Sequence, residues 1–200
     1  EGADTLAIAR GRGSTASHVV IWNHVAGTQS RPIASSETWI MCVRASPDGK
    51  HLAIGGDDGT VRLLETESLA VRRLGDVQAD VVKSLSFSFD GRVLAAAYGD
   101  GSVRLWDMVS GKPHTSFFAD HAGHLSDISF IADSTVLATA GHDGVINCWS
   151  ARDRKQVRSL RGHAVPVFSL AASSQQALFV SSGNDWDKKQ SEVRIWRVDE

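Results

Sequence analysis

The chain has 200 residues, 42% of them hydrophobic and 22% charged, and its formal net charge is −2. These values are ordinary for a globular protein with a sizeable core. No run of lysine or arginine builds a basic stripe, and no apolar stretch approaches the roughly 18 residues that a membrane span needs. We therefore expect neither a nucleic-acid partner nor a membrane partner.

Only two cysteines occur, Cys42 and Cys148, and both fall in apolar, strand-like segments. We interpret them as small buried hydrophobic side chains that do not form a disulfide. Thiols of this kind are typical of a reducing compartment, so we expect a cytoplasmic protein.

Taken in chain order, the predicted elements repeat. Asp-Gly pairs recur 42 and 43 residues apart, and each Asp is followed six positions later by Leu or Trp, in Asp58–Leu64, Asp100–Trp106 and Asp143–Trp149. The same frame extends upstream to Trp22 and downstream to Trp196. It divides the chain into five units, at approximately 1–35, 36–77, 78–120, 121–162 and 163–200.

Each unit is predicted to be β structure. Short runs such as "VLAAAYG" and "VRLWD" are rich in β-branched, aromatic and other apolar residues, and Asp-Gly between them is a strong hairpin signal. Further turns, "SPDGK", "SFDGR" and "VSGK", separate the other strands. We expect four short antiparallel strands in a unit, here named a to d, and almost no helix.

A four-stranded repeat of about 42 residues with these landmarks resembles the WD40 family of β-propellers. The best single match is "GDGSVRLWD", and the resemblance covers essentially the whole chain. It implies one propeller region over residues 1–200 with about five visible blades, the first and the last incomplete. Because such propellers usually close with about seven blades, near 290 residues, we expect this chain to be a portion of a longer one.

The resemblance also implies a hydrogen-bonded clamp in each blade: a His before strand a, a Ser or Thr in strand b, the turn Asp and the strand-c Trp. In the fourth unit these positions hold His121, Thr139, Asp143 and Trp149. In the fifth they hold His163, Ser181, Asp185 and Trp196. The second and third units lack the His and the strand-b hydroxyl together, as expected if the two groups serve each other.

A hydroxyl, an imidazole and a carboxylate would also suit a hydrolase. The set occurs once per unit, however, and its hydroxyl is engaged by an indole, so we predict no catalytic residues. The pair His121 and His124 has metal-ligand spacing, but His121 belongs to the clamp and no Cys or Glu accompanies the pair. We predict no metal and no cofactor.

Two insertions depart from the repeat, and both lie between strands b and c. One is "STAS", residues 14–17, and the other is "NDWDKKQSE", which places Trp186 on a polar loop. Because b–c loops and d–a loops share one face in the family, we expect a partner-binding surface there. Its candidate residues are Trp186, Trp39, His124, His142, Asp57, Lys188 and Lys189.

The sequence therefore predicts a non-enzymatic scaffold for protein–protein interaction. Its partners would be other proteins or peptides, or the missing blades of the same chain. The alternative is a regulatory or sensing WD40 portion of a larger protein whose enzymatic domain, such as a kinase or protease, lies outside this sequence.

Overall fold

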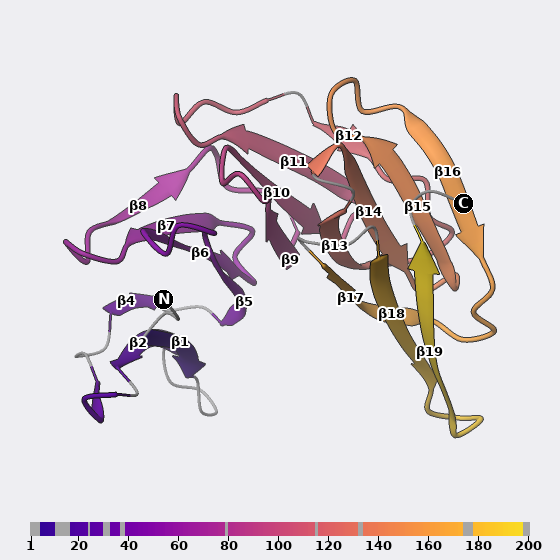
Figure 1. The fold of residues 1–200 in the computed structure, drawn as a ribbon, viewed down its shortest axis with the longest axis horizontal. Helices are drawn as coiled ribbons and strands as arrows, with labels where there is room; N and C mark the ends of the chain where they lie inside the picture. Colours follow the sequence, from indigo (N-terminus) through magenta and orange to yellow (C-terminus); the bar gives the residue numbers. More distant parts are fainter. Residues whose placement is uncertain are drawn as a thin grey trace. The chain divides into compact units, whose positions relative to one another are not determined.

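The computed structural model describes residues 5–10, 17–23, 25–29, 33–36, 39–78, 80–114, 116–131, 134–173 and 178–197. Within these ranges the chain forms nineteen β-strands in five antiparallel sheets (Figure 1). The predicted all-β class and the four-stranded repeat are confirmed. Nowhere in the described ranges is there a helix long and apolar enough to cross a membrane.

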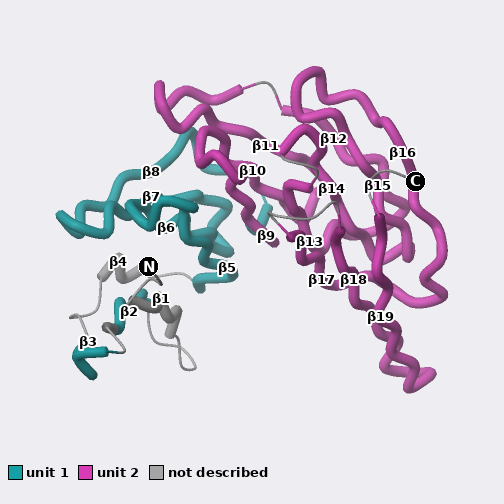
Figure 2. Tube along the Cα trace, in the orientation of Figure 1, with its two compact units in different colours: residues 1–82 teal, residues 83–200 magenta. Residues whose placement is uncertain are grey.

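The chain divides into two compact units, residues 1–82 and 83–200 (Figure 2). The first unit contains two sheets. One consists of β1 (Thr5–Arg10), β2 (Ser17–Asn23), β3 (Thr28–Gln29) and β4 (Ile33–Ser36), with β3 and β4 both paired to β2. The other consists of β5 (Ile40–Ala45), β6 (His51–Gly56), β7 (Val61–Glu65) and β8 (Val71–Leu74) in that order.

The second unit contains three sheets, each again in sequence order. The first has β9 (Val82–Phe87), β10 (Val93–Tyr98), β11 (Ser102–Asp107) and β12 (Phe117–Phe118). The next has β13 (Leu125–Ile131), β14 (Val136–Gly141), β15 (Val145–Ser150) and β16 (Gln156–Arg161). The last has β17 (Val167–Ala172), β18 (Leu178–Asp185) and β19 (Gln190–Arg197). We call these five sheets blades one to five.

The first blade differs from the prediction in one detail. Strands β3 and β4 both pair with β2, so strand d is divided into two short pieces. Of the predicted "STAS" insertion, residues 14–16 lie outside the described residues. That the five blades form one continuous region, with boundaries as given above, stays a prediction.

The Asp-Gly pairs do turn the chain from strand b to strand c. Gly59, Gly101 and Gly144 have φ values of 71°, 85° and 74°, a left-handed conformation that other residues adopt only under strain. A Cβ at Gly59 would also lie 2.2 Å from the carbonyl oxygen of Gln78. Glycine is therefore required at these turns for conformational reasons, with no need for a role in binding.

The hydrophobic core lies between neighbouring blades. In the second unit, Leu125, Ile128 and Phe130 of β13 pack in one cluster with Val103 and Leu105 of β11. A second cluster joins the fourth and fifth blades, and includes Ile131, Ile146, Cys148, Val167 and Phe179. Because the blades of the second unit cover one another in this way, the turns at the ends of their strands remain exposed and can carry binding residues.

Blade clamps and candidate interaction surface

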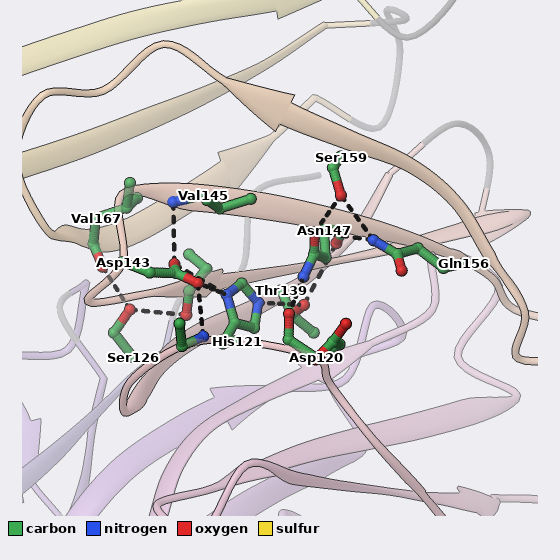
Figure 3. Close-up of polar contacts among 12 residues, drawn as sticks. Asp120, His121, Ser126, Thr139, Asp143, Val145, Asn147, Gln156, Ser159 and Val167 are labelled. Atoms are coloured by element: carbon green, nitrogen blue, oxygen red, sulfur yellow. Dashed lines mark hydrogen bonds and ion pairs between the residues drawn. The ribbon is translucent and has the colours of Figure 1, made fainter.

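In the fourth blade the four predicted clamp residues form one hydrogen-bonded set. Figure 3 shows three of them, His121, Thr139 and Asp143. His121 Nε2 lies 2.9 Å from Thr139 Oγ1, and His121 Nδ1 lies 3.1 Å from Asp143 Oδ1. The indole N–H of Trp149 donates to Thr139 Oγ1 over 2.9 Å. An ionised carboxylate can only accept, so Nδ1 of His121 carries a proton and donates to Asp143.

Asp143 is held by the backbone as well as by His121. Its Oδ1 accepts from Val145 N–H at 3.0 Å, and its Oδ2 accepts from Ala122 N–H at 2.9 Å. Burial opposes ionisation of this carboxyl, but the hydrogen bonds from Val145, His121 and Ala122 outweigh it and lower its pKa. The charged form of Asp143 therefore ties the start of the blade to its b–c turn.

This arrangement does not suit nucleophilic chemistry, although it has the residues of a hydrolase. Thr139 is fully buried, and only 1% of the His121 side chain is exposed. The hydroxyl already accepts from Trp149 and lies 3.3 Å from the carbonyl oxygen of Asn147. A substrate carbonyl would have to displace these partners, and an acyl-transfer site needs open space beside the nucleophile.

The fifth blade has the same His, Ser and Trp contacts. His163 Nε2 lies 2.6 Å from Ser181 Oγ, and Trp196 Nε1 donates to the same oxygen at 2.7 Å. The acid differs from the prediction: Glu192 Oε2 lies 3.1 Å from His163 Nδ1, an ion-pair distance without the alignment of a hydrogen bond. The Glu192 carboxylate also accepts from Ala164 N–H, the position equivalent to Ala122.

The assignment of Asp185 to this clamp is therefore wrong. Strands β18 and β19 continue pairing to Asp185 and Gln190, which carries Asp185 along the hairpin and away from His163. There its Oδ1 accepts from the N–H groups of Asp187 and Lys188, and its Oδ2 pairs with Lys188 Nζ at 3.0 Å. Hydrogen bonds from Lys188, first from its backbone, lower the pKa of Asp185.

The second and third blades lack the histidine, and each shows a different consequence. In the second, Arg62 pairs with Asp58 at 2.6 Å. Desolvation of Asp58 is outweighed by hydrogen bonds from Arg62 and Thr60, so its pKa falls to about 2. In the third, the buried Nε1 of Trp106 has no hydrogen-bond partner among the described residues. Ala96 stands at the position of the missing hydroxyl.

Asn147 is a structural residue that the sequence analysis missed. It is 2% exposed, and its amide donates to the carbonyl oxygen of Asp120 at 2.7 Å. Its Oδ1 accepts from Gln156 and from Ser159 on the outer strand β16. Asn147 occupies the place held by Arg104 and Arg194 in the third and fifth blades, and that departure from the repeat was the available signal.

Asp127 is a buried carboxylate that joins the inner strands of three blades. It accepts from Ser84 Oγ of β9, from its neighbour Ile128 N–H, and from Leu170 N–H of β17 at 2.7 Å. All of these partners are donors, as a buried carboxylate requires. The residue is 5% exposed, and its hydrogen bonds stabilise the packing of β9, β13 and β17.

Of the two tryptophans among the predicted partner-binding residues, Trp186 is the more exposed, at 80% against 59% for Trp39. It lies in the turn of the β18–β19 hairpin, whose strands are eight residues long against six in β14 and β15. Figure 1 shows this hairpin extending past the other strands of its unit. Lys188 and Lys189 lie in the same turn and are exposed, with Lys188 paired to Asp185.

His124 and His142 come together at the fourth blade. Their rings lie 5.9 Å apart, edge to face, and the His142 ring contacts Phe168 of β17 with 5.0 Å between centroids. Burial lowers the pKa of His142 and the nearby His124 and Lys83 lower it further, against the opposing charge of Asp143. This group is an exposed, partly aromatic patch on the turns of the unit.

Trp39 and Asp57 belong to the first unit and are bound to each other. The backbone N–H of Trp39 donates to Asp57 Oδ1 at 2.8 Å, and Asp57 N–H donates to the Trp39 carbonyl oxygen at 2.9 Å. The Trp39 indole stays 59% exposed. The structure thus holds the backbone before β5 against the b–c turn and leaves the indole available.

The family model described as "WD domain, G-beta repeat" matches residues 27–64, 71–107, 111–150 and 154–197. The chain belongs to the WD40 repeat family. Each WD40 match spans strand d of one blade and strands a to c of the next. WD40 propeller families generally act as protein-binding scaffolds.

Curated WD40 relatives match parts of this chain. SEC12-like protein 1 of Arabidopsis thaliana is 36% identical over 72 residues, which are 36% of this chain and 18% of that protein. The guanine nucleotide-binding protein subunit beta of Nicotiana tabacum is 31% identical over 98 residues, 46% of this chain and 26% of that protein. Periodic tryptophan protein 2 of Arabidopsis thaliana is 29% identical over 160 residues, 80% of this chain and 17% of that protein.

Solved structures show the same fold. A chain in the crystal structure of a mitotic checkpoint complex superimposes with a TM-score of 0.80 and 23% identity, covering 98% of this chain and 57% of that one. The structure of U3-55K gives a TM-score of 0.69 and 21% identity, covering 82% and 54%. This chain therefore spans between about a sixth and a quarter of the curated relatives above, and little more than half of these WD40 structures.

Proposed function

We propose that this WD40 chain is a non-enzymatic scaffold that binds another protein through the turns of its second unit, with Trp186 as the anchor. The observation that carries the proposal is the exposed indole at the end of the long β18–β19 hairpin. The blade clamps engage the buried histidines and hydroxyls in structural hydrogen bonds, so the residues outside the repeat are the ones free to serve binding.

Trp186 has the make-up of an interface centre. Tryptophan is enriched among residues that dominate binding energy, because a large rigid ring buries much apolar surface at a small entropic cost. Asp187, Lys188 and Lys189 surround it with charges of both signs, which suits a polar rim. His124 and His142 offer a second contact on turns of the same unit.

The absence of catalysis is part of the proposal. Its support is that the His–hydroxyl–carboxylate set of the fourth blade is closed by Trp149 and by burial. A cytoplasmic location belongs to the proposal too, supported by two cysteines that form no disulfide, with burial raising the pKa of the Cys148 thiol to about 11. Trp39 and Asp57 are proposed as a contact of the first unit.

The test is Trp186→Ala in a pull-down with the protein, followed by affinity measurement with the partner recovered. We expect a loss of about 2 kcal/mol or more in binding free energy, with the melting temperature nearly unchanged. Phe118→Ala is the matched control, because Phe118 is an aromatic residue exposed by 72% on strand β12. Unchanged affinity for Trp186→Ala, or a loss equal to that of Phe118→Ala, would reject the proposed anchor.

A further inference from the structure

Strand β16 and the turn before it carry an unusual number of cations. The segment 152–161 contains five arginine or lysine residues and one acid, Asp153; the cations are Arg152, Arg154, Lys155, Arg158 and Arg161. Four of the five are exposed and Arg154 is half-buried. These cations are interrupted by other residues and form no continuous basic run, so the sequence analysis did not single them out.

These cations form no close ion pair with the described carboxylates, although Lys155 and Arg152 interact electrostatically with Asp153. None of the five side chains forms an ion pair or hydrogen bond with another described residue, in contrast to Arg62 and Arg194, which pair with carboxylates. The carboxyl of Asp153 is held by the Ser150 hydroxyl, which lowers its pKa. The positive charge of the strand is left available to a partner.

An apolar pocket lies beside this charge. It has a volume of about 180 Å³ and lies between the fourth and fifth blades of the second unit. Its apolar lining includes Ile131, Val157, Leu160 and Phe179. Arg158 of β16 and Arg197 of β19 also line it, so the pocket combines apolar side chains with two arginines.

The β16 strand gives access to the pocket from outside. It is the last strand of its sheet and pairs with β15 alone among the described strands. A shift in the pairing register next to Arg158 lets two sequence neighbours, Val157 and Arg158, both line the pocket. Val157 is 57% exposed although it is apolar, and so lies at the entrance.

We propose that this surface binds an acidic peptide that places one aliphatic side chain in the pocket and pairs its carboxylates with Arg158 and the neighbouring cations of residues 152–161. The inference rests on the proposed scaffold function but concerns a surface separate from Trp186. The Arg fork matches a carboxylate with two parallel hydrogen bonds, and a pocket of this size suits one side chain.

Charge complementarity favours a peptide over nucleic acid. A nucleic acid needs a basic surface that follows many phosphates, whereas this charge is confined to one strand and its turn in a chain of net charge −2. The apolar side chains that line the pocket also have no matching apolar group in a phosphate backbone. A peptide with alternating acidic and aliphatic residues uses both parts of the surface.

The corresponding place in the second blade provides a matched control. A second pocket there is lined by Leu63, Val71 and Arg72, with Arg72 at the strand position equivalent to Arg158. Glu65 also lines that pocket. Its charge opposes an acidic ligand, so Arg72 should not contribute to binding.

The experiment measures fluorescence anisotropy of the protein with a labelled peptide that carries one leucine among glutamates and aspartates. We expect Arg158→Ala to weaken binding by about threefold to tenfold and Arg72→Ala to leave it unchanged. Replacing the leucine of the peptide by serine should weaken binding to a similar degree, because the pocket is then left unfilled. Trp186→Ala should have no effect on this peptide.

Three results would overturn the proposal. They are no binding of the peptide, equal losses for Arg158→Ala and Arg72→Ala, or tighter binding of a labelled single-stranded DNA than of the peptide. A loss with Trp186→Ala alone would place the acidic peptide on the turns of the second unit instead. Because the proposed scaffold function is tested separately through Trp186 and its own partner, either can fail without the other.

Discussion

Trp106 and Ala96 lie on the paired strands β11 and β10, and the indole N–H of Trp106 is buried without a hydrogen-bond partner because Ala96 has no hydroxyl. In the fourth and fifth blades the equivalent indoles donate to Thr139 and Ser181 at 2.9 Å and 2.7 Å. A buried donor left unpaired costs about 1–3 kcal/mol. The third blade is therefore less stable than it would be with a hydroxyl that accepts from the indole.

Ala96→Ser should therefore stabilise the protein. The new hydroxyl would lie where Ser181 lies in the fifth blade, and would accept from Trp106 Nε1. We expect the free energy of unfolding to rise by about 1 kcal/mol, measured by urea denaturation.

Ala95→Ser is the control for that gain. Ala95 is equally buried, but it faces the apolar cluster that contains Leu105 and Leu137, where a hydroxyl finds no partner. It should destabilise the protein. If both serines destabilise equally, the unpaired indole is not what limits the third blade.

His121→Ala should destabilise the fourth blade by about 1–3 kcal/mol, because it removes a partner from both Thr139 and Asp143. Gln78→Ala should cost clearly less, since the Gln78 side-chain amide donates to the carbonyl oxygen of Asp76 in an exposed contact. A urea series on both variants decides the matter, and equal losses would contradict the role of His121 as a clamp.

Much of this fold could be predicted because the repeated positions show which residues of each unit are equivalent. The Asp-Gly turn and the strand-c Trp fix which residues pair across strands b and c, so the clamp that the WD40 resemblance implies could be placed on the His121 set. The acid of the fifth clamp did not follow, because the longer hairpin breaks the spacing counted forward from Ser181. Glu192 lies four residues before Trp196, as Val145 lies four residues before Trp149. Counting back from the strand-c Trp therefore places Glu192 directly beside the turn, and this spacing was the signal that could have identified the acid.

The charged surface of β16 was missed for a different physical reason. Its cations are separated by Asp153, Gln156, Val157, Ser159 and Leu160, so no continuous run appears in the sequence. Whether those charges are neutralised depends on which carboxylates lie near them in space. The sequence also gives no sign that Arg197, on the next blade, shares a pocket with Arg158.

Glu192→Gln should lower the pKa of His163 further. Burial already holds that pKa below its ordinary value, and the Glu192 charge is what opposes the decrease. Asp185→Asn should leave it unchanged, because Asp185 is bonded within its own turn. Titration of the His163 ring by NMR tests both variants, and a larger shift with Asp185→Asn would restore the original assignment of the acid.

The protein should lose stability as the pH falls below about 6.5, the ordinary histidine pKa. Burial is the first cause that lowers the pKa of both His163 and His142 in the folded state. The unfolded chain then takes up protons at a higher pH than the folded chain, so protonation favours unfolding. The stabilising effect of the neutral rings is complete above the unfolded pKa and decreases as the pH falls towards the folded pKa.

Urea midpoints measured between about pH 7.5 and about pH 5 test this dependence, since the carboxyls with lowered pKa, such as Asp143, stay ionised over that range. The neighbours His124 and Lys83 favour the neutral form of the His142 ring, and the charge of Asp143 opposes them. His142→Gln removes one of the two titrating rings, so its midpoint should depend less on pH than that of the unchanged protein. A midpoint that is constant or rises on acidification would show that neither ring is held neutral by the fold.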